Sequence, residues 1–154
     1  MKKVLLPILA CVLALTGCSA NSHLFKLPLN PVPYSFKVDP SIVTHLSVRI
    51  STDDFAKAAT KDGAKAQAIV YYTPTSGKEV IFMSVYLFQQ AIFDHLKNPN
   101  QPPSYGQEVI RRNGEVLSIA GPSDSIFDPK SADGKNVTAL YATIYKASSY
   151  SPTP

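Results

Sequence analysis

Few side chains in this sequence are reactive, and the two cysteines have the most informative positions. Cys11 lies inside an apolar stretch of twelve residues, Val4–Leu15, which follows the positive charges of Lys2 and Lys3. A bilayer core about 30 Å thick needs about 20 apolar residues to cross it, so this stretch is too short. Its length and the charge before it are typical of a signal peptide. Cys18 follows directly after this expected leader.

The residues Leu15-Thr16-Gly17-Cys18 resemble the lipobox of bacterial lipoproteins. Leu15 matches the third position before the modified cysteine, Gly17 the position directly before it, and Cys18 the acceptor itself. The resemblance extends over residues 1–18 only. It implies that residues 1–17 are a signal peptide, that the Cys18 thiol carries diacylglycerol, and that Cys18 is the first residue of the mature chain. The alternative for this segment is a buried N-terminal helix.

The same resemblance implies a location in the cell. Lipoprotein processing places two or three acyl chains, such as palmitate, on one residue, and stable membrane anchoring needs more than one chain. Ser19, where an aspartate would retain the protein at the inner membrane, resembles the sorting pattern for the outer membrane of Gram-negative bacteria. We therefore expect a lipid-anchored envelope protein, in the outer membrane and facing the periplasm or the cell surface. In an organism with a single membrane, the anchor would lie in its outer leaflet.

The remaining reactive residues do not form a recognisable catalytic or metal-binding pattern. Without Cys11 and with Cys18 modified, the mature domain has no free thiol for disulfides, catalysis or metal binding. His23, His45 and His95 are not spaced as metal ligands, and no G-x-S-x-G nucleophile motif occurs. We therefore expect no cofactor, no metal and no enzymatic activity.

The carboxylates also have simpler explanations than acid–base chemistry. Asp53 and Asp54 follow Thr52, a good N-cap, and negative charge stabilises the first turn of a helix. Asp124, Asp128 and Asp133 share one loop, but they lack the spacing and the distal glutamate of a calcium loop.

Five residues are candidates for binding a partner. Arg111 and Arg112 precede a predicted hairpin turn, where they form a basic tip or protect a sheet edge from aggregation. Asp124, Phe127 and Asp128 lie in a long polar connection. Phe127 either closes the end of the core, which we favour, or is an anchor residue for a partner.

The composition predicts one β-rich domain to hold these residues. The chain has 154 residues, with 45% hydrophobic and 17% charged residues, 13 prolines and no tryptophan. This is enough apolar material for one core, and the high proline content favours strands over a helix bundle. Without Lys2 and Lys3, 13 Lys and Arg face 11 Asp and Glu, a net charge of +2 that excludes a nucleic-acid footprint.

Periodicity and turn residues predict the elements of this domain. Alternation predicts strands, among them a central strand over 79–88 that is apolar on both faces. Asn113-Gly114 predicts a two-residue hairpin turn. The predicted strands are 46–50, 66–73, 79–88, 107–112, 115–120 and 137–146, and the predicted helices are 53–61 and 89–97.

Residues 18–35 contain three prolines and predict an extended tether between the lipid and the domain. We expect a globular domain over 36–147 and a frayed tail over 148–154. The fold class that fits best is all-β: an antiparallel β-sandwich, immunoglobulin-like or similar, with one or two short helices and a long connection as a Greek-key crossover. The alternative is an α+β roll, with both helices on one face of a curved sheet.

Two classes of function fit these features. The first is a non-enzymatic, membrane-anchored binding or assembly module, whose partner is a protein or the cell wall. The second is a small envelope hydrolase, with a site built from the loops 89–106 and 121–136. A histidine in a cleft with Asp94, Asp124 or Asp128 would favour the second class.

Overall fold

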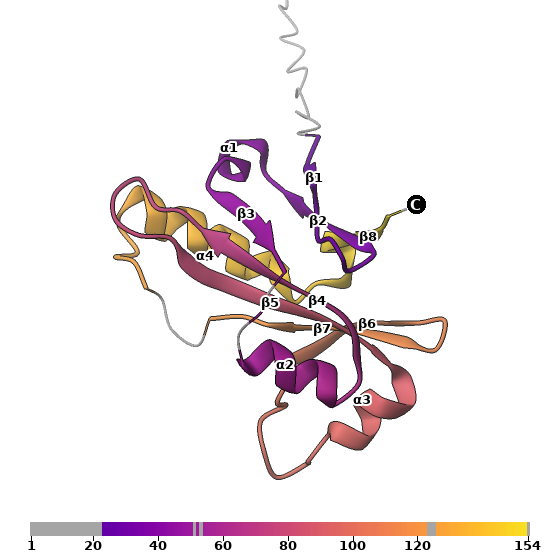
Figure 1. Ribbon diagram of the computed structural model, residues 1–154. Coiled ribbons are helices and arrows are strands. Elements are labelled where there is room, and N and C mark those ends of the chain that lie inside the picture. Colours follow the sequence, from indigo (N-terminus) through magenta and orange to yellow (C-terminus); the bar gives the residue numbers. More distant parts are fainter. Residues whose placement is uncertain (1–22, 51, 53, 123–125, 154) are drawn as a thin grey trace, which may run out of the picture.

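The protein is mostly β, with two antiparallel sheets packed together (Figure 1). The computed structural model describes residues 23–50, 52, 54–122 and 126–153, so the expected signal peptide, Cys18, Asp53 and Asp124 lie outside the described residues. The sheets have three and five strands. This architecture confirms the predicted β-sandwich.

The larger sheet has the strand order β3-β4-β5-β7-β6. Strand β5 lies in the middle and pairs with β4 on one side and β7 on the other, as its two apolar faces predicted. The strands are β3 (Leu46–Arg49), β4 (Ala64–Tyr72), β5 (Val80–Gln89), β6 (Gln107–Arg112) and β7 (Glu115–Ala120).

The predicted hairpin joins β6 to β7 through Asn113 and Gly114. Both residues have positive φ angles, 53° and 75°, which a type I′ turn requires and which Asn and Gly adopt at low cost. Because β7 pairs with β5, this hairpin places β6 at the outer edge of the sheet.

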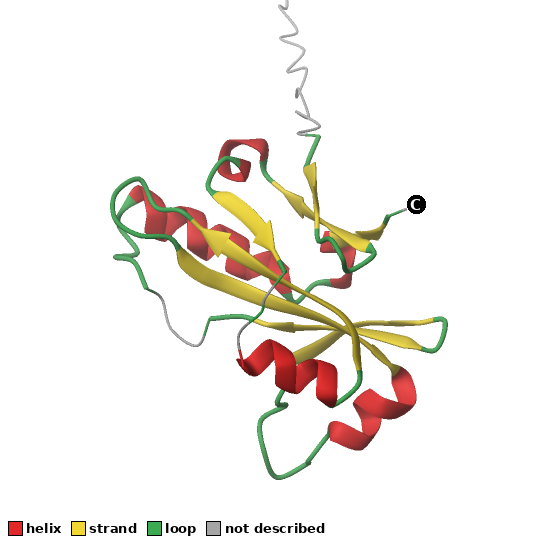
Figure 2. Cartoon of the chain, in the orientation of Figure 1, coloured by secondary structure: helices red, strands yellow, loops and turns green. Residues whose placement is uncertain are grey.

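The two faces of the larger sheet bury separate apolar cores. Val85 and Leu87 of β5 point into a large core that the smaller sheet covers. Tyr86 and Phe88 point to the opposite face, where α2 (Asp54–Lys61) and α3 (Gln90–Leu96) cover them. The protein therefore has layers, with α2 and α3 on the side of the large sheet away from the small sheet (Figure 2). Both helices agree with the sequence prediction.

One predicted strand is wrong. Residues 137–146 were expected to be a strand, but Ala132–Ile144 form the helix α4. Ser131 caps it, because its hydroxyl accepts a hydrogen bond from the Gly134 N–H at 2.9 Å. The buried side chains Val137, Leu140 and Ile144 are three and four residues apart, which is the helical period, and they pack into the large core. The long connection before α4 therefore leads into a helix and makes no Greek-key crossover to a strand.

The predicted tether and tail are also wrong for the described residues. Strands β1 (Phe25–Pro28), β2 (Tyr34–Val38) and β8 (Tyr150–Pro152) form the smaller sheet, and β2 pairs with both others. Leu29 and Val32 of the supposed tether are fully buried. Tyr150 of the supposed tail stacks on Phe36 and donates its hydroxyl to the Ile144 carbonyl at 2.6 Å. The folded unit therefore extends from about residue 25 to residue 152. The short helices α1 (Pro40–Val43) and η1 (Ala147–Ser149) complete it.

Truncation tests how far the folded unit extends. A chain of residues 23–154 should fold, whereas a chain of residues 36–154 should not. The shorter chain lacks Leu27, Leu29 and Val32, which are at most 9% exposed. Each contributes about 1.5–3 kcal/mol of burial, against a total stability of about 5–15 kcal/mol. Near-ultraviolet circular dichroism with thermal melting measures the difference, and equal melting temperatures would show that residues 23–35 are a tether after all.

Candidate functional site

Arg111 is held in a network of charges on the protein itself. Its guanidinium donates to both carboxylate oxygens of Asp94, at 2.7 and 2.9 Å, and to Glu108 at 2.6 and 2.7 Å. Lys97 also pairs with Glu108 at 3.0 Å. The hydrogen bonds from Arg111 lower the pKa of the Asp94 and Glu108 carboxyls to about 2. Arg111 therefore fastens α3 to β6, a structural role that neither of the two interpretations from the sequence, a basic tip or edge protection, includes.

Arg112 remains exposed near the tip of the hairpin, on the edge strand β6. Its cross-strand neighbour Glu115 forms an ion pair with Lys65 of β4. A charged side chain on an edge strand discourages pairing with another sheet, which agrees with the alternative interpretation of this residue.

Phe127 and Asp128 lie at the opposite end of the larger sheet. Phe127 is half-buried and packs on Tyr72, with the ring centroids 5.5 Å apart. The Asp128 carboxylate accepts a hydrogen bond from the Lys130 N–H, and its carbonyl accepts one from the Ser131 hydroxyl. Strand β4 gives the distance between the two groups, because Tyr72 contacts Phe127 and Lys65 pairs with Glu115, the neighbour of Arg112. Tyr72 and Lys65 are seven residues apart on β4, or about 23 Å at the usual strand rise. The structure therefore does not bring the arginines together with Phe127 and Asp128, and Asp124 lies outside the described residues.

A polar cluster surrounds Tyr72 beside the start of α4. The Tyr72 hydroxyl donates to Asp133 at 2.8 Å and accepts from Asn136, and the ring stacks on His45 at 5.3 Å. The same hydrogen bond lowers the pKa of Asp133, whereas burial raises the pKa of Tyr72. His45 bonds to the Thr73 carbonyl oxygen at 2.8 Å. These contacts join β3, β4 and α4, so the cluster has a structural role.

The two loops named for a hydrolase site are largely occupied by packing. In the first, Tyr105 is buried and donates to Asp62 at 2.6 Å. Gly106, with φ +78°, lies so close to β7 that a Cβ atom there would be 2.1 Å from the Ile119 carbonyl oxygen. The second leads into the cap of α4. Among the described residues, no group of three or more His, Cys, Asp or Glu side chains is arranged to hold a metal ion.

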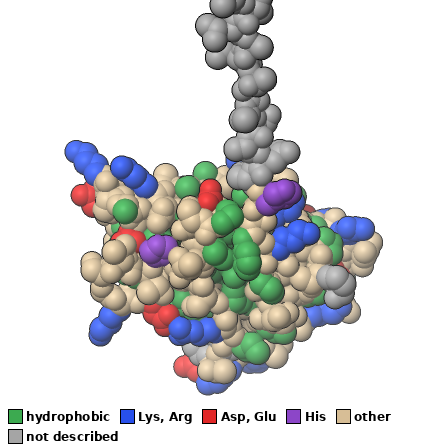
Figure 3. All heavy atoms as spheres, turned by 90° about the horizontal axis from the view of Figure 1, so that it is seen from above, with side chains coloured by type: hydrophobic (Ala, Val, Ile, Leu, Met, Phe, Trp, Pro, Cys, Tyr) green, Lys and Arg blue, Asp and Glu red, His purple; other side chains and the backbone are tan. Residues whose placement is uncertain are grey.

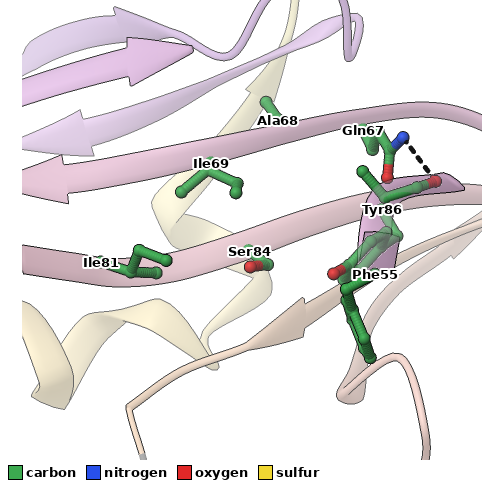
Figure 4. A pocket seen from close by; sticks show the side chains of 8 residues that line it. Phe55, Gln67, Ala68, Ile69, Ile81, Ser84 and Tyr86 are labelled. Carbon is green, nitrogen blue, oxygen red and sulfur yellow. Dashed lines mark hydrogen bonds between the residues drawn. The ribbon is translucent and has the colours of Figure 1, made fainter. Parts of the chain in front are cut away.

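The candidate site is an apolar pocket between α2 and the outer face of β4 and β5 (Figure 4). Its walls come from three consecutive elements, with Phe55 from α2, Ile69 from β4, and Ile81 and Tyr86 from β5. Phe55 and Ile81 are 52% and 49% exposed, which is high for large apolar side chains. The full lining is Phe55, Ala56, Gln67, Ala68, Ile69, Ile81, Ser84 and Tyr86.

Two polar groups interrupt this apolar surface. Gln67 donates from its amide nitrogen to the Ala56 carbonyl at 2.9 Å, which connects β4 to α2 (Figure 4). Its oxygen Oε1 is buried without a hydrogen-bond partner among the described residues. The second group is the hydroxyl of Ser84. The pocket lining includes no histidine and no carboxylate, and its polar groups are the Gln67 amide and the Ser84 hydroxyl.

Charged residues border the pocket region. Arg49 forms a two-pronged ion pair with Glu79, at 2.5 and 2.7 Å, and lies over the Tyr71 ring at 4.7 Å. Because Arg49 and Tyr71 neighbour Ile69 and Ile81 in the strand register, the ion pair lies on the same face. An apolar centre with a polar rim is the usual anatomy of a protein–protein interface.

The volume of the pocket indicates whether a small molecule or a single side chain fits it. Its volume is about 180 Å³. Small-molecule sites usually enclose roughly 300–1,000 Å³. The pocket therefore fits one apolar side chain of a macromolecular partner better than a cofactor. The sequence pattern does not reveal this site, because strict alternation places Ile81 and Tyr86 on opposite faces of β5. A register irregularity between the pairs Val70–Met83 and Tyr71–Ile81 brings both side chains to the same face.

Comparisons with protein-family models, curated proteins and solved structures find no match for this chain. Within the described part of the chain, no helix has the length and apolar character needed to cross a bilayer.

The Arg111 network makes stability depend on pH. The pKa values of Asp94 and Glu108 fall from the ordinary 3.8 and 4.5 to about 2 in the folded protein. Depressed carboxyl pKa values stabilise the fold above about pH 4.5, and this stabilisation is lost as the pH falls towards about 2. Arg111→Gln should flatten this dependence, and Arg112→Gln should leave it unchanged. Urea unfolding between about pH 2 and 6 measures both, and parallel curves for all three proteins would contradict the assigned role of Arg111.

Proposed function

We propose that the protein is a lipid-anchored lipoprotein of the bacterial cell envelope that acts as a non-enzymatic binding or assembly module. The observation that carries this proposal is the order of the charged start, the short apolar stretch and Leu15-Thr16-Gly17-Cys18 in the sequence. Ser19 supports the outer membrane as the location. The partner is a protein or a component of the cell wall, and the apolar pocket beside α2 receives one of its apolar groups.

The layers of the fold support a lipid anchor on one side of the domain and partner binding on the other. The described chain begins beside β1, in the smaller sheet (Figure 1). The pocket lies on the far face of the larger sheet, next to α2. Packed sheets are about 10 Å apart, so the thickness of the sandwich separates the two. A lipid on Cys18 would hold the smaller sheet near the membrane and leave the pocket facing away from it.

Processing of the N-terminus tests the anchor. Cys18→Ala should accumulate as the unprocessed precursor, because the thiol that receives diacylglycerol is absent. Mass spectrometry of the protein purified from its native membrane should find an N-terminal cysteine with two or three acyl chains. An intact Met1 with an unmodified Cys18 thiol would refute the lipoprotein assignment.

Partner capture tests the pocket. Crosslinking in intact cells should yield an adduct between the protein and its partner. Ile81→Asp should reduce this adduct by roughly tenfold or more, because losing an anchor residue typically costs about 2 kcal/mol or more. The melting temperature should change little, because Ile81 is 49% exposed.

Ile126→Asp is the matched control, since Ile126 is equally exposed at 50% and does not line the pocket. This variant should keep the full yield of adduct. Equal yields from Ile81→Asp and the unmodified protein would show that the partner binds elsewhere.

A further inference from the structure

A second apolar surface lies where the described chain begins. Leu24 and Phe25 are 49% and 45% exposed. Phe25 begins β1, the edge strand of the smaller sheet, and Leu24 directly precedes it. Seen from above, the side of the smaller sheet and α1, hydrophobic side chains form a band with lysine or arginine side chains at its margin (Figure 3). The band faces away from α2 and the candidate pocket.

Leu24 also lines a groove of about 390 Å³ between β2, α1 and α4. The groove floor is apolar, with Val38, Ile42 and Leu140 among its walls. Leu24 is about half exposed at the margin of this groove, and the exposed Phe25 follows it as the first residue of β1.

Three lysines surround this surface without a carboxylate partner. Lys26 and Lys37 are directly opposite each other in the β1–β2 register, where like charges repel. Lys37 and Lys146 both line the groove. Among the described residues, none of these three lysines has an acidic group within ion-pair distance, and Lys37 donates to the Ser148 carbonyl oxygen at 2.9 Å. The one carboxylate in the groove lining, Asp39, accepts hydrogen bonds from Ser41 at the start of α1.

We propose that this surface docks on the bilayer, with Leu24 and Phe25 in the headgroup layer and the three lysines on anionic phospholipid headgroups. The inference rests on the proposed lipid at Cys18. Leu24 is only six positions after Cys18, with five residues between them, and a fully extended chain covers at most about 3.6 Å per residue. The surface therefore stays within roughly 20 Å of the anchored cysteine.

The chemistry of the surface matches a membrane interface. Aromatic and aliphatic side chains next to lysines are the combination that binds the boundary between headgroups and acyl chains. Anionic phosphates would relieve the repulsion between Lys26 and Lys37. The contact also fixes the orientation of the domain, so that the pocket beside α2 faces away from the membrane rather than sampling all directions.

A tryptophan probe tests this docking, because the chain has no tryptophan of its own. The lipidated full-length Phe25→Trp protein is reconstituted into vesicles of phosphatidylethanolamine and phosphatidylglycerol with brominated acyl chains. Its emission should shift to shorter wavelength and fall by about half or more compared with unbrominated vesicles. The matched control is Phe55→Trp, since Phe55 is similarly exposed at 52% and lies on α2. Its emission should not respond to bromine.

Charge variants test the role of the lysines, and the acylation state of Cys18 separates failure of the docking from failure of the anchor. Adding Lys26→Glu and Lys37→Glu to the Phe25→Trp protein should remove most of the quenching, and the same loss should follow when phosphatidylcholine replaces the anionic lipid. Suppose that mass spectrometry confirms the acylated Cys18 of the Phe25→Trp protein. If bromine then does not quench the tryptophan emission, the docking proposal is overturned and the lipid anchor still holds. A blue shift without any vesicles also overturns the docking, because protein then covers the surface. An unmodified Cys18 overturns the anchor and the docking together.

Discussion

The structure depends on a strand that must be covered on both faces. Strand β5 carries Val85 and Leu87 on one side and Tyr86 and Phe88 on the other, and all four are at most 4% exposed. Burying each of these large side chains contributes about 1.5–3 kcal/mol. One layer can cover only one face, so the smaller sheet and α4 pack on one side and α2 and α3 on the other. The short helices cover only part of their face, and the candidate pocket lies at their edge.

Local patterns in the sequence predicted much of this arrangement. The apolar residues on both faces of β5 predicted a central strand, and Asn113-Gly114 predicted the turn of its neighbouring hairpin. Acidic residues in the first turn and basic residues later in 53–61 predicted α2. These signals depend on residues near each other in the chain. They were reliable because each element follows its local preference without competition from distant contacts.

Most of the errors came from segments whose structure depends on distant partners. Three prolines made residues 18–35 look like a tether, but β1 pairs with β2, and β2 also pairs with β8, more than a hundred residues later. No local pattern shows that Tyr150 will stack on Phe36. The α4 error is different, because its deciding signals are local: the Ser131 cap and the helical spacing of Val137, Leu140 and Ile144. The ion pair of Arg111 with Asp94 again depends on a distant partner, seventeen residues away.

The pairing of both chain ends in one small sheet has a consequence for the proposed anchoring. A tether of 18–35 would let the domain turn freely and sit far from the bilayer. Because the described chain is already folded at Phe25, the lipid on Cys18 would hold the domain by a short connection. The side of the molecule that bears Leu24, Lys26 and Lys37 is then the side nearest the membrane. The opposite layer, with α2 and the pocket, is the one that a partner in solution or in the cell wall can reach. In this arrangement the sandwich is a spacer between two binding surfaces, and the double covering of β5 keeps them on opposite faces.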